Sequence, residues 1–173
     1  MLRSAQMAHR NTVSFGDRLA SSDAFKVLFR EGMLLVEEAA AYLDGPGRRD
    51  SRLLPRSEAL AYASESMRLT TRLMQLASWL LLQRAVNEGD LTQAQAQTDK
   101  HKVNLARQEL ATTPEVFSRL PERLQELAIQ SQRLQDRVIH LDLLIYGEAE
   151  APIAPAILNQ FETLRAAFDT RPA

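Results

Sequence analysis

Cysteine is absent from this 173-residue chain, which excludes disulfides, thiolate metal sites and cysteine nucleophiles and fits a reducing cytosol. Its 21 Lys and Arg residues nearly balance its 22 Asp and Glu residues. The net charge of −1 provides no overall basic field of the kind that drives nucleic-acid binding. Its apolar runs are far shorter than the ~20 residues that a membrane-spanning helix needs. We therefore expect neither nucleic-acid binding nor a membrane span.

Motifs for catalysis and metal binding are also missing. Helical bundles that hold two metal ions use Glu-x-x-His pairs, but Gln, Thr and Arg stand three residues before His9, His101 and His140. The sequence has neither a phosphate-binding Gly-rich loop nor a G-x-S-x-G nucleophile motif. We expect no catalytic residue, no cofactor and no metal, and a degenerate enzyme or ligand-binding bundle is disfavoured for the same reason.

Helical periodicity is the main signal that is present. Residues 57–88 contain no Gly and no Pro, and their apolar side chains follow two neighbouring stripes. The first stripe is Leu60, Ala63, Met67, Met74, Ala77 and Leu81, and the second is Leu69, Leu73, Leu76 and Leu80. Because the stripes merge over residues 73–82, this helix should be buried all round, at the centre of a bundle or partly against a second copy of the protein.

Two further long helices accompany it. A helix over 22–44 ends at Gly45-Pro46-Gly47, and Gly32 in its middle predicts the close approach of a neighbouring helix. Residues 117–145 place apolar residues at alternating spacings of three and four, interrupted at Ser131, which predicts a helix over 119–146. Residues 92–108 predict a short polar side helix. Short links between long helices favour an up-down-up order, so we expect an all-α, antiparallel three-helix bundle with flexible termini.

The bundle domain is expected over residues 21–147, between two flexible ends. Residues 1–20 lack the apolar core of a secretory signal and are expected to form a flexible arm. Residues 148–173 begin as a Pro/Ala linker and continue as a short amphipathic segment. Its apolar residues share one helical face and are candidates for docking a partner or for packing back on the bundle: Ile157, Phe161, Leu164 and Phe168.

Two groups of side chains within the bundle are candidates for binding partners. The first lies between the apolar stripes and could form a partner or dimer surface, because Arg and Trp are frequent interface anchors. It comprises Glu65, Arg68, Arg72, Gln75 and Trp79. The second is a basic loop that could steer an acidic partner: Arg48, Arg49, Arg52 and Arg56. The alternatives are ordinary surface ion pairs for the first group and a solvated turn for the second.

The merged apolar stripes also predict a homodimer. An apolar arc wider than two neighbouring helices can cover would otherwise remain exposed. We expect the dimer to use the C-terminal half of the helix over 56–88 together with the last long helix.

Three blocks of the sequence resemble a known family. They are FREGMLLVEEAAAYLDGPGR (Phe29 to Arg48), LAYASESMRLTTRLMQLASWLL (Leu60 to Leu81) and LPERLQELAIQSQRLQDRVIHLD (Leu120 to Asp142). These blocks are similar to the regulator-of-CtrA-degradation adaptors of alphaproteobacteria, the RcdA family. Together they cover the predicted bundle and leave out the first twenty residues and the tail.

The resemblance implies a homodimeric three-helix bundle in the bacterial cytosol, sometimes gathered at a cell pole. It implies a non-enzymatic adaptor of cell-cycle proteolysis, which tethers protein cargo to a AAA+ protease, ClpXP, primed by a response-regulator-type factor. A second adaptor that responds to cyclic di-GMP can build on such a complex. No contact residue is carried over from the family. The alternative function is a dimeric helical regulator that binds a signalling protein without any protease.

Overall fold

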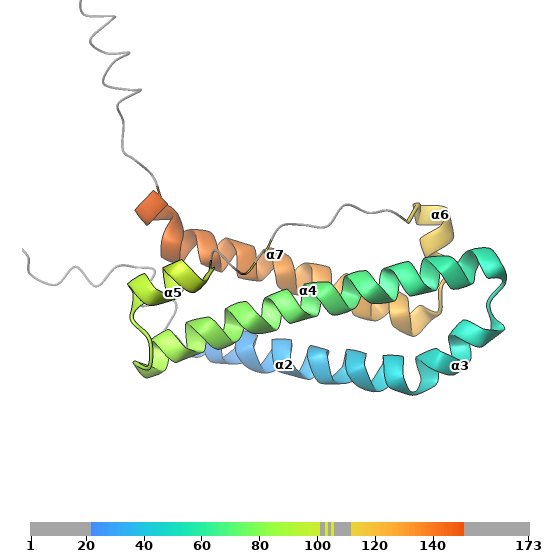
Figure 1. Ribbon diagram of the computed structural model, residues 1–173, viewed down its shortest axis with the longest axis horizontal. Helices are drawn as coiled ribbons and strands as arrows, with labels where there is room; N and C mark the ends of the chain where they lie inside the picture. The colour runs from blue at the N-terminus through green and yellow to red at the C-terminus, as the bar shows by residue number, and fades with distance from the viewer. Residues whose placement is uncertain (1–21, 101–102, 104, 106–111, 151–173) are drawn as a thin grey trace, which may run out of the picture.

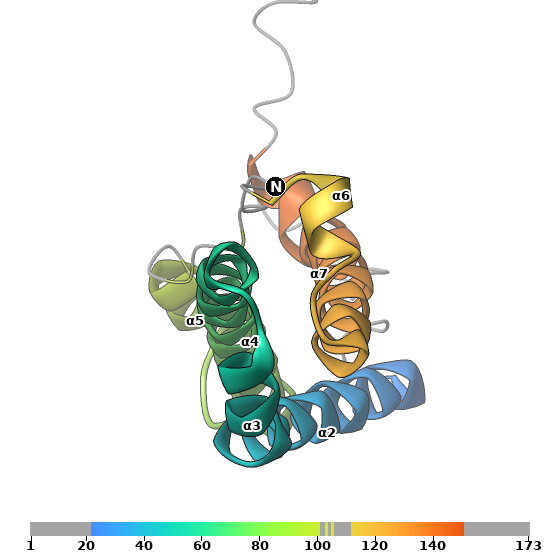
Figure 2. The same ribbon diagram turned by 90° about the vertical axis from the view of Figure 1, so that its right-hand side faces the viewer.

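The computed structural model describes residues 22–100, 103, 105 and 112–150. Within these ranges the ordered elements are helices, which confirms the all-α class (Figure 1). The long helices are α2 (Asp23–Asp44), α4 (Arg56–Glu88) and α7 (Glu122–Glu150), and the short ones are α3 (Pro46–Leu53), α5 (Gln93–Lys100) and α6 (Pro114–Phe117). Seen end-on, α2 lies beneath both α4 and α7 (Figure 2). The three long helices therefore form a bundle.

The long helices do not alternate in direction as the sequence analysis expected. The α2 and α4 helices are antiparallel, since the ring centroid of Phe25, near the start of α2, lies 6.5 Å from that of Trp79 in the second half of α4. The α4 and α7 helices run the same way, because Arg72 contacts Ser131 and Gln83 contacts Tyr146 (Figure 1). The up-down-up expectation is thus wrong for α7. Residues 89–121 form too long a link to force a reversal, and they carry the chain from the end of α4 to a point beside its start.

The core lies between the three long helices and uses the second apolar stripe of α4. Its buried side chains on α4 are Leu69, Leu73, Leu76, Trp79 and Leu80. The periodic residues of the last helix face the same core: Leu124, Leu127, Leu134, Val138, Leu141 and Ile145. Ser131, the polar interruption of that pattern, is also fully buried.

At Gly32, α2 closely approaches both α4 and α7. A Cβ atom at this position would lie 2.5 Å from Leu80 Cδ1 and 3.5 Å from Leu134 Cδ2. A side chain therefore cannot be added without moving Leu80, which is fully buried. The close approach predicted from a glycine within a helix is confirmed.

Three elements differ from the expected boundaries. The predicted basic loop is a helix, α3, because Pro46 at its first position already has the φ angle of a helix. The side helix is shorter than predicted, since α5 ends at Lys100. The last helix continues past Gly147 to Glu150, because one glycine costs a helix only about 1 kcal/mol and need not end it.

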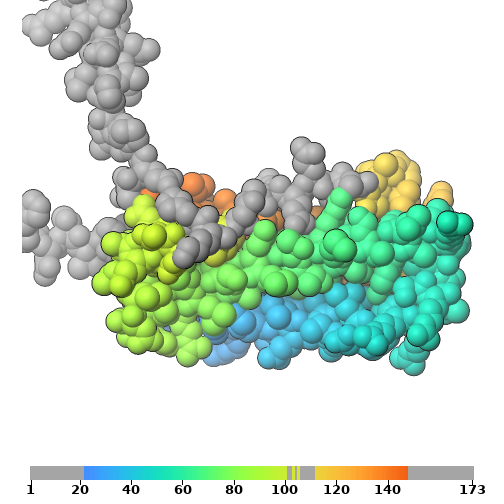
Figure 3. Space-filling model, in the orientation of Figure 1, coloured from blue at the N-terminus to red at the C-terminus, as the bar shows by residue number. Residues whose placement is uncertain are grey.

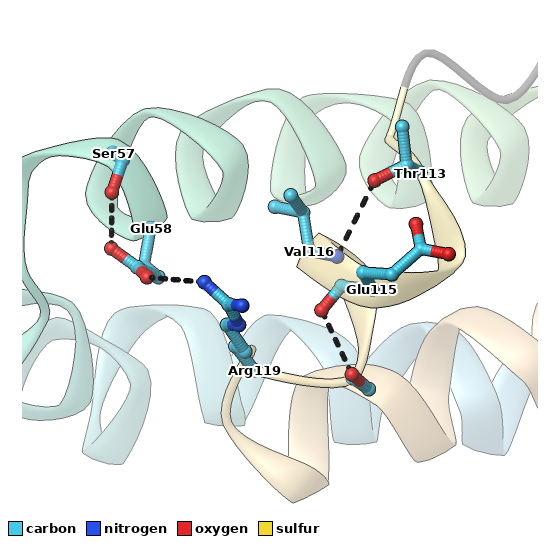
Figure 4. Close-up of polar contacts among 7 residues, drawn as sticks. Ser57, Glu58, Thr113, Glu115, Val116 and Arg119 are labelled. Atoms are coloured by element: carbon cyan, nitrogen blue, oxygen red, sulfur yellow. Dashed lines mark hydrogen bonds and ion pairs between the residues drawn. The ribbon is translucent and has the colours of Figure 1, made fainter.

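Polar contacts attach the end of the long link to the start of α4 (Figure 4). Thr113 caps α6, since its hydroxyl accepts from the backbone N–H of Val116 at 3.4 Å. Arg119 lies 3.7 Å from the carboxylate of Glu58, which also accepts from the hydroxyl of Ser57. The Ser57 bond, and the nearby Arg119 charge to a lesser degree, lower the pKa of Glu58.

Candidate partner-binding surfaces

Most of the polar candidates on α4 lie inside the bundle. Glu65, Arg72 and Trp79 are 0%, 2% and 1% exposed. Arg68 and Gln75 are half-buried. The prediction of a partner or dimer surface is therefore wrong for the three buried residues, because Arg72 and Trp79 pack against α7 and Glu65 contacts Thr112. Sequence spacing placed all five on one helix face but could not show which face was covered.

Arg72 anchors a buried polar seam between α4 and α7. Its Nη1 donates to Ser131 Oγ at 2.8 Å, and that hydroxyl donates to the carbonyl of Ala128 at 2.7 Å. Burial lowers the pKa of Arg72, Glu65 opposes this shift, and Arg68 adds to it. Several buried polar atoms of the seam have no hydrogen-bond partner among the residues that the structure describes: Glu65 Oε1, Arg68 Nη1, Arg72 Nε and Gln75 Oε1. Two described residues between α5 and α6 contact this seam: Thr112 reaches Glu65 at 3.5 Å, and the carbonyl of Leu105 accepts from Gln135.

Trp79 is an anchor of the fold rather than of an interface. Its indole N–H donates to Asp142 Oδ1 at 2.8 Å, and the other oxygen of Asp142 lies 2.8 Å from Lys100 Nζ. The Lys100 ammonium also lies 4.5 Å from the ring centroid of Tyr146. These contacts join α4, α5 and α7. The sequence analysis missed Asp142 and Lys100, because single charged residues on polar faces give no pattern.

The opposite face of α4 is exposed and apolar. We call Leu60, Met67, Met74 and Leu81 the outer stripe; they recur every seven residues and are 68%, 72%, 66% and 52% exposed. Between residues 57 and 81, the exposed side chains of α4 are all uncharged: Ser57, Leu60, Ala63, Ser64, Met67, Thr70, Met74, Ser78 and Leu81. Helix α4 forms part of the molecular surface that Figure 3 shows. A long exposed helix face without charge is typical of an interaction surface. The expectation that this helix is buried all round is therefore wrong within one protomer, because α2 and α7 pack against the other side of α4.

The basic candidates gather at the end of the bundle where α2 meets α4. Arg48, Arg49 and Arg52 are exposed on α3, and Arg56 is the first residue of α4. Arg48 forms an ion pair with Asp44 at 3.0 Å. Tyr42 beneath them donates its hydroxyl to Asp50 at 2.9 Å, and burial with this hydrogen bond raises the pKa of Tyr42.

A groove lies at the other end, between the first half of α2 and the last turns of α4. Its volume is about 620 Å³, and its apolar lining consists of Phe25, Phe29, Met33 and Leu34. The guanidinium of Arg84 lies 5.0 Å from the ring centroid of Phe29 and forms an ion pair with Glu88 at 2.7 Å. This groove was not foreseen, because it depends on how far α2 and α4 separate.

The remaining expectations concern metal ligands, membrane spans and the tail. Across residues 22–100 and 112–150, together with 103 and 105, the side chains form no group of three or more potential metal ligands. The helices in those ranges include none that is long and apolar enough to cross a membrane. The candidate docking residues Ile157, Phe161, Leu164 and Phe168 lie outside the described residues.

Comparisons with known proteins agree with the resemblance seen in the three sequence blocks. The model of a family described as a protein of unknown function (DUF1465) matches residues 16–168. The crystal structure of RcdA from Caulobacter crescentus CB15 is 51% identical to this chain and has a TM-score of 0.60. That similarity covers 72% of this chain and 92% of the RcdA chain. The chain belongs to the RcdA family.

The match of the family model extends beyond the bundle. A comparison with curated protein sequences gave no match. The family model, however, continues through residue 168 and so includes the apolar positions of the tail. The matched range therefore spans the candidate docking residues of the tail as well as the three long helices.

Proposed function

We propose that this RcdA-family chain is a non-enzymatic adaptor that tethers protein substrates to a primed ClpXP protease in cell-cycle-regulated proteolysis. The proposed site of action is the bacterial cytoplasm, including a cell pole. Family membership at 51% identity carries the proposal. The uncharged outer stripe of α4 supports it, because an adaptor works through surfaces that bind proteins.

A reconstituted degradation assay tests the adaptor proposal. It would combine the purified chain with ClpXP, the response-regulator-type priming factor and the CtrA protein of the same host as cargo. We expect the chain to accelerate cargo loss several-fold, and only when the priming factor is present. Binding of cargo without faster degradation would contradict the proposal and favour the alternative, a dimeric regulator that is not linked to a protease.

We further propose that the chain is a homodimer formed by antiparallel pairing of the outer stripes. A twofold axis between residues 70 and 71 places Leu60 opposite the partner's Leu81, and Met67 opposite the partner's Met74. It also brings Arg56 near the partner's Glu88, whereas parallel pairing would bring two copies of Arg56 together. The sequence pattern also predicted a part for the last helix in the dimer interface. A substitution of Leu143, which is 60% exposed on α7, tests that part.

The remaining partner surfaces are proposals of the same kind. We propose that the basic residues of α3, together with Arg56, form the face that binds an acidic partner. The candidates for this partner are the priming factor and the second adaptor that responds to cyclic di-GMP.

The tail is proposed to dock a partner through Ile157, Phe161, Leu164 and Phe168. Deleting residues 151–173 should leave the thermal midpoint unchanged and abolish one interaction in a pull-down from the host. A midpoint lowered by several degrees, with every partner retained, would show instead that the tail packs on the bundle.

A further inference from the structure

The groove between α2 and α4 is an apolar surface with charged residues placed along its length. Phe25 and Phe29 lie toward one end, and Leu34 near the other end is 50% exposed. Lys26 and Arg30 line the groove close to the start of α2, and Glu37 lines it at the far end. An occupant of this groove should therefore be apolar in the middle, acidic near the start of α2 and basic near Glu37.

The chain enters the described structure at the groove itself. Ser22 is both a lining residue of the groove and the first described residue. The segment that precedes it is therefore attached directly to one end of the groove and needs no linker to reach it. The tail, in contrast, follows α7, and the lining contains no residue of that helix.

The sequence before Ser22 has the order of side chains that this groove requires. Val13 and Phe15 are two residues apart, so they face the same way in an extended chain. Gly16 follows them and can adopt the backbone conformations of a chain reversal. Asp17 lies on the side nearer to Ser22, and Arg10 lies farther away.

The lengths agree as well. An extended chain from Arg10 to Phe15 covers about 17 Å, at about 3.4 Å per residue. The stretch of α2 from Lys26 to Glu37 covers about 17 Å, at about 1.5 Å per residue. From Phe29 to Glu37 the helix covers about 12 Å, so a segment that turns back at residues 16–21 is long enough to bring Arg10 to Glu37 while Phe15 stays near Phe29.

We propose that residues 10–17 fold back across this groove as an intramolecular ligand. Val13 and Phe15 cover the apolar lining at Phe29 and Met33. Asp17 lies beside Lys26 and Arg30, and Arg10 lies beside Glu37. Any partner helix that uses the groove must then displace the N-terminal segment, which makes the groove a competed interaction surface.

The absence of cysteine allows a direct test by engineered disulfides in the full chain. One variant combines Arg10→Cys with Glu37→Cys. The matched control combines Arg10→Cys with Glu38→Cys, the next residue of α2, which turns toward α7 and pairs with Arg123 at 2.8 Å. We expect the first pair to close within one chain at least ~10-fold faster, because docking raises its effective concentration. Adding Phe15→Ser should reduce its rate to that of the control.

Equal rates for the two pairs would overturn the inference. A disulfide that forms only between chains would assign the groove to a second copy of the protein instead. Faster closure of Phe161→Cys with Glu37→Cys would assign it to the tail. As an independent measurement, deleting residues 1–20 should increase the fluorescence of an added apolar dye several-fold, whereas deleting residues 151–173 should leave it unchanged. No increase on removal of the N-terminal segment would equally count against the inference.

Discussion

Replacing the two methionines of the outer stripe should separate the dimer without harming the fold. In the proposed antiparallel pairing, Met67 of each protomer faces the partner's Met74. The variant Met67→Lys with Met74→Lys places four ammonium groups at the centre of the interface. Both side chains are mostly exposed in the isolated protomer, so neither supports its core.

The magnitude follows from their exposure. Full burial of a Met side chain stabilises by about 1.5–3 kcal/mol. Met67 and Met74 are 72% and 66% exposed, so burial in a dimer should contribute about 1–2 kcal/mol for each. A twofold interface contains four such side chains, and their loss removes about 4–8 kcal/mol. The dissociation constant should therefore rise by a factor of about 1,000 or more. The free energy of unfolding of the protomer should change by less than about 0.5 kcal/mol.

Sedimentation velocity at micromolar concentration, combined with urea unfolding, measures both quantities. The variant Met67→Lys with Met74→Glu is the matched control: antiparallel pairing sets each ammonium against a carboxylate and should keep the dimer, whereas parallel pairing would set like charges together. Leu143→Lys should leave the dimer intact if α7 takes no part. A wild-type protein that sediments as a 19.5 kDa monomer, or a double-Lys variant that still forms dimers, would refute the proposal.

Three further predictions concern the bundle itself. Gly32→Ala should lower the free energy of unfolding by about 1 kcal/mol, because overpacking against the buried Leu80 outweighs the better helix propensity of Ala. Gly147→Ala, whose Cβ would have no neighbour nearer than 3.9 Å, should instead raise it in the same urea titration. Arg72→Met should lower the free energy of unfolding by about 3 kcal/mol, because it leaves the buried Glu65 carboxyl without this cation. Adding Glu65→Leu should recover most of the lost stability, and a double variant no more stable than Arg72→Met would contradict this. Because the pKa of Tyr42 is raised in the folded protein, its hydroxyl proton is lost at lower pH from the unfolded chain than from the folded one. The free energy of unfolding should therefore fall above about pH 10, and it should fall less steeply in Tyr42→Phe.

Sequence patterns located the helices because their boundaries depend on local residues. The predicted helix over 56–88 coincides with α4, since Pro55 and Gly89 flank a stretch without breakers. The apolar face of α7 from Leu124 to Ile145 was predicted equally well, because the spacing that defines it lies within a single helix. The direction of α7 was not predictable in this way. It depends on the path of residues 89–121, whose polar composition carries no periodic signal.

The candidate site shows a second limit of pattern reasoning. Glu65, Arg68 and Arg72 follow a helical spacing that suits a solvated rim as well as a buried seam. Leu60, Met67 and Met74 follow a spacing that suits a core as well as an exposed face. Composition alone favours charges outside and apolar residues inside, and α4 reverses that assignment for these residues while its second apolar stripe stays in the core. Only the packing of α7 against one face of α4 distinguishes the two.

This reversal has a structural cause and a functional consequence. Because α7 runs parallel to α4, the chain must return along the bundle between them, and two described residues of this link, Leu105 and Thr112, contact the polar seam. The described link residues therefore lie on the side of the polar seam, whereas the outer stripe is exposed. Covering a seam that contains unpaired polar atoms stabilises little, whereas leaving four large apolar side chains in water forfeits burial energy. An arrangement of this kind is favourable when another protein surface covers the outer stripe, as the proposed dimer would.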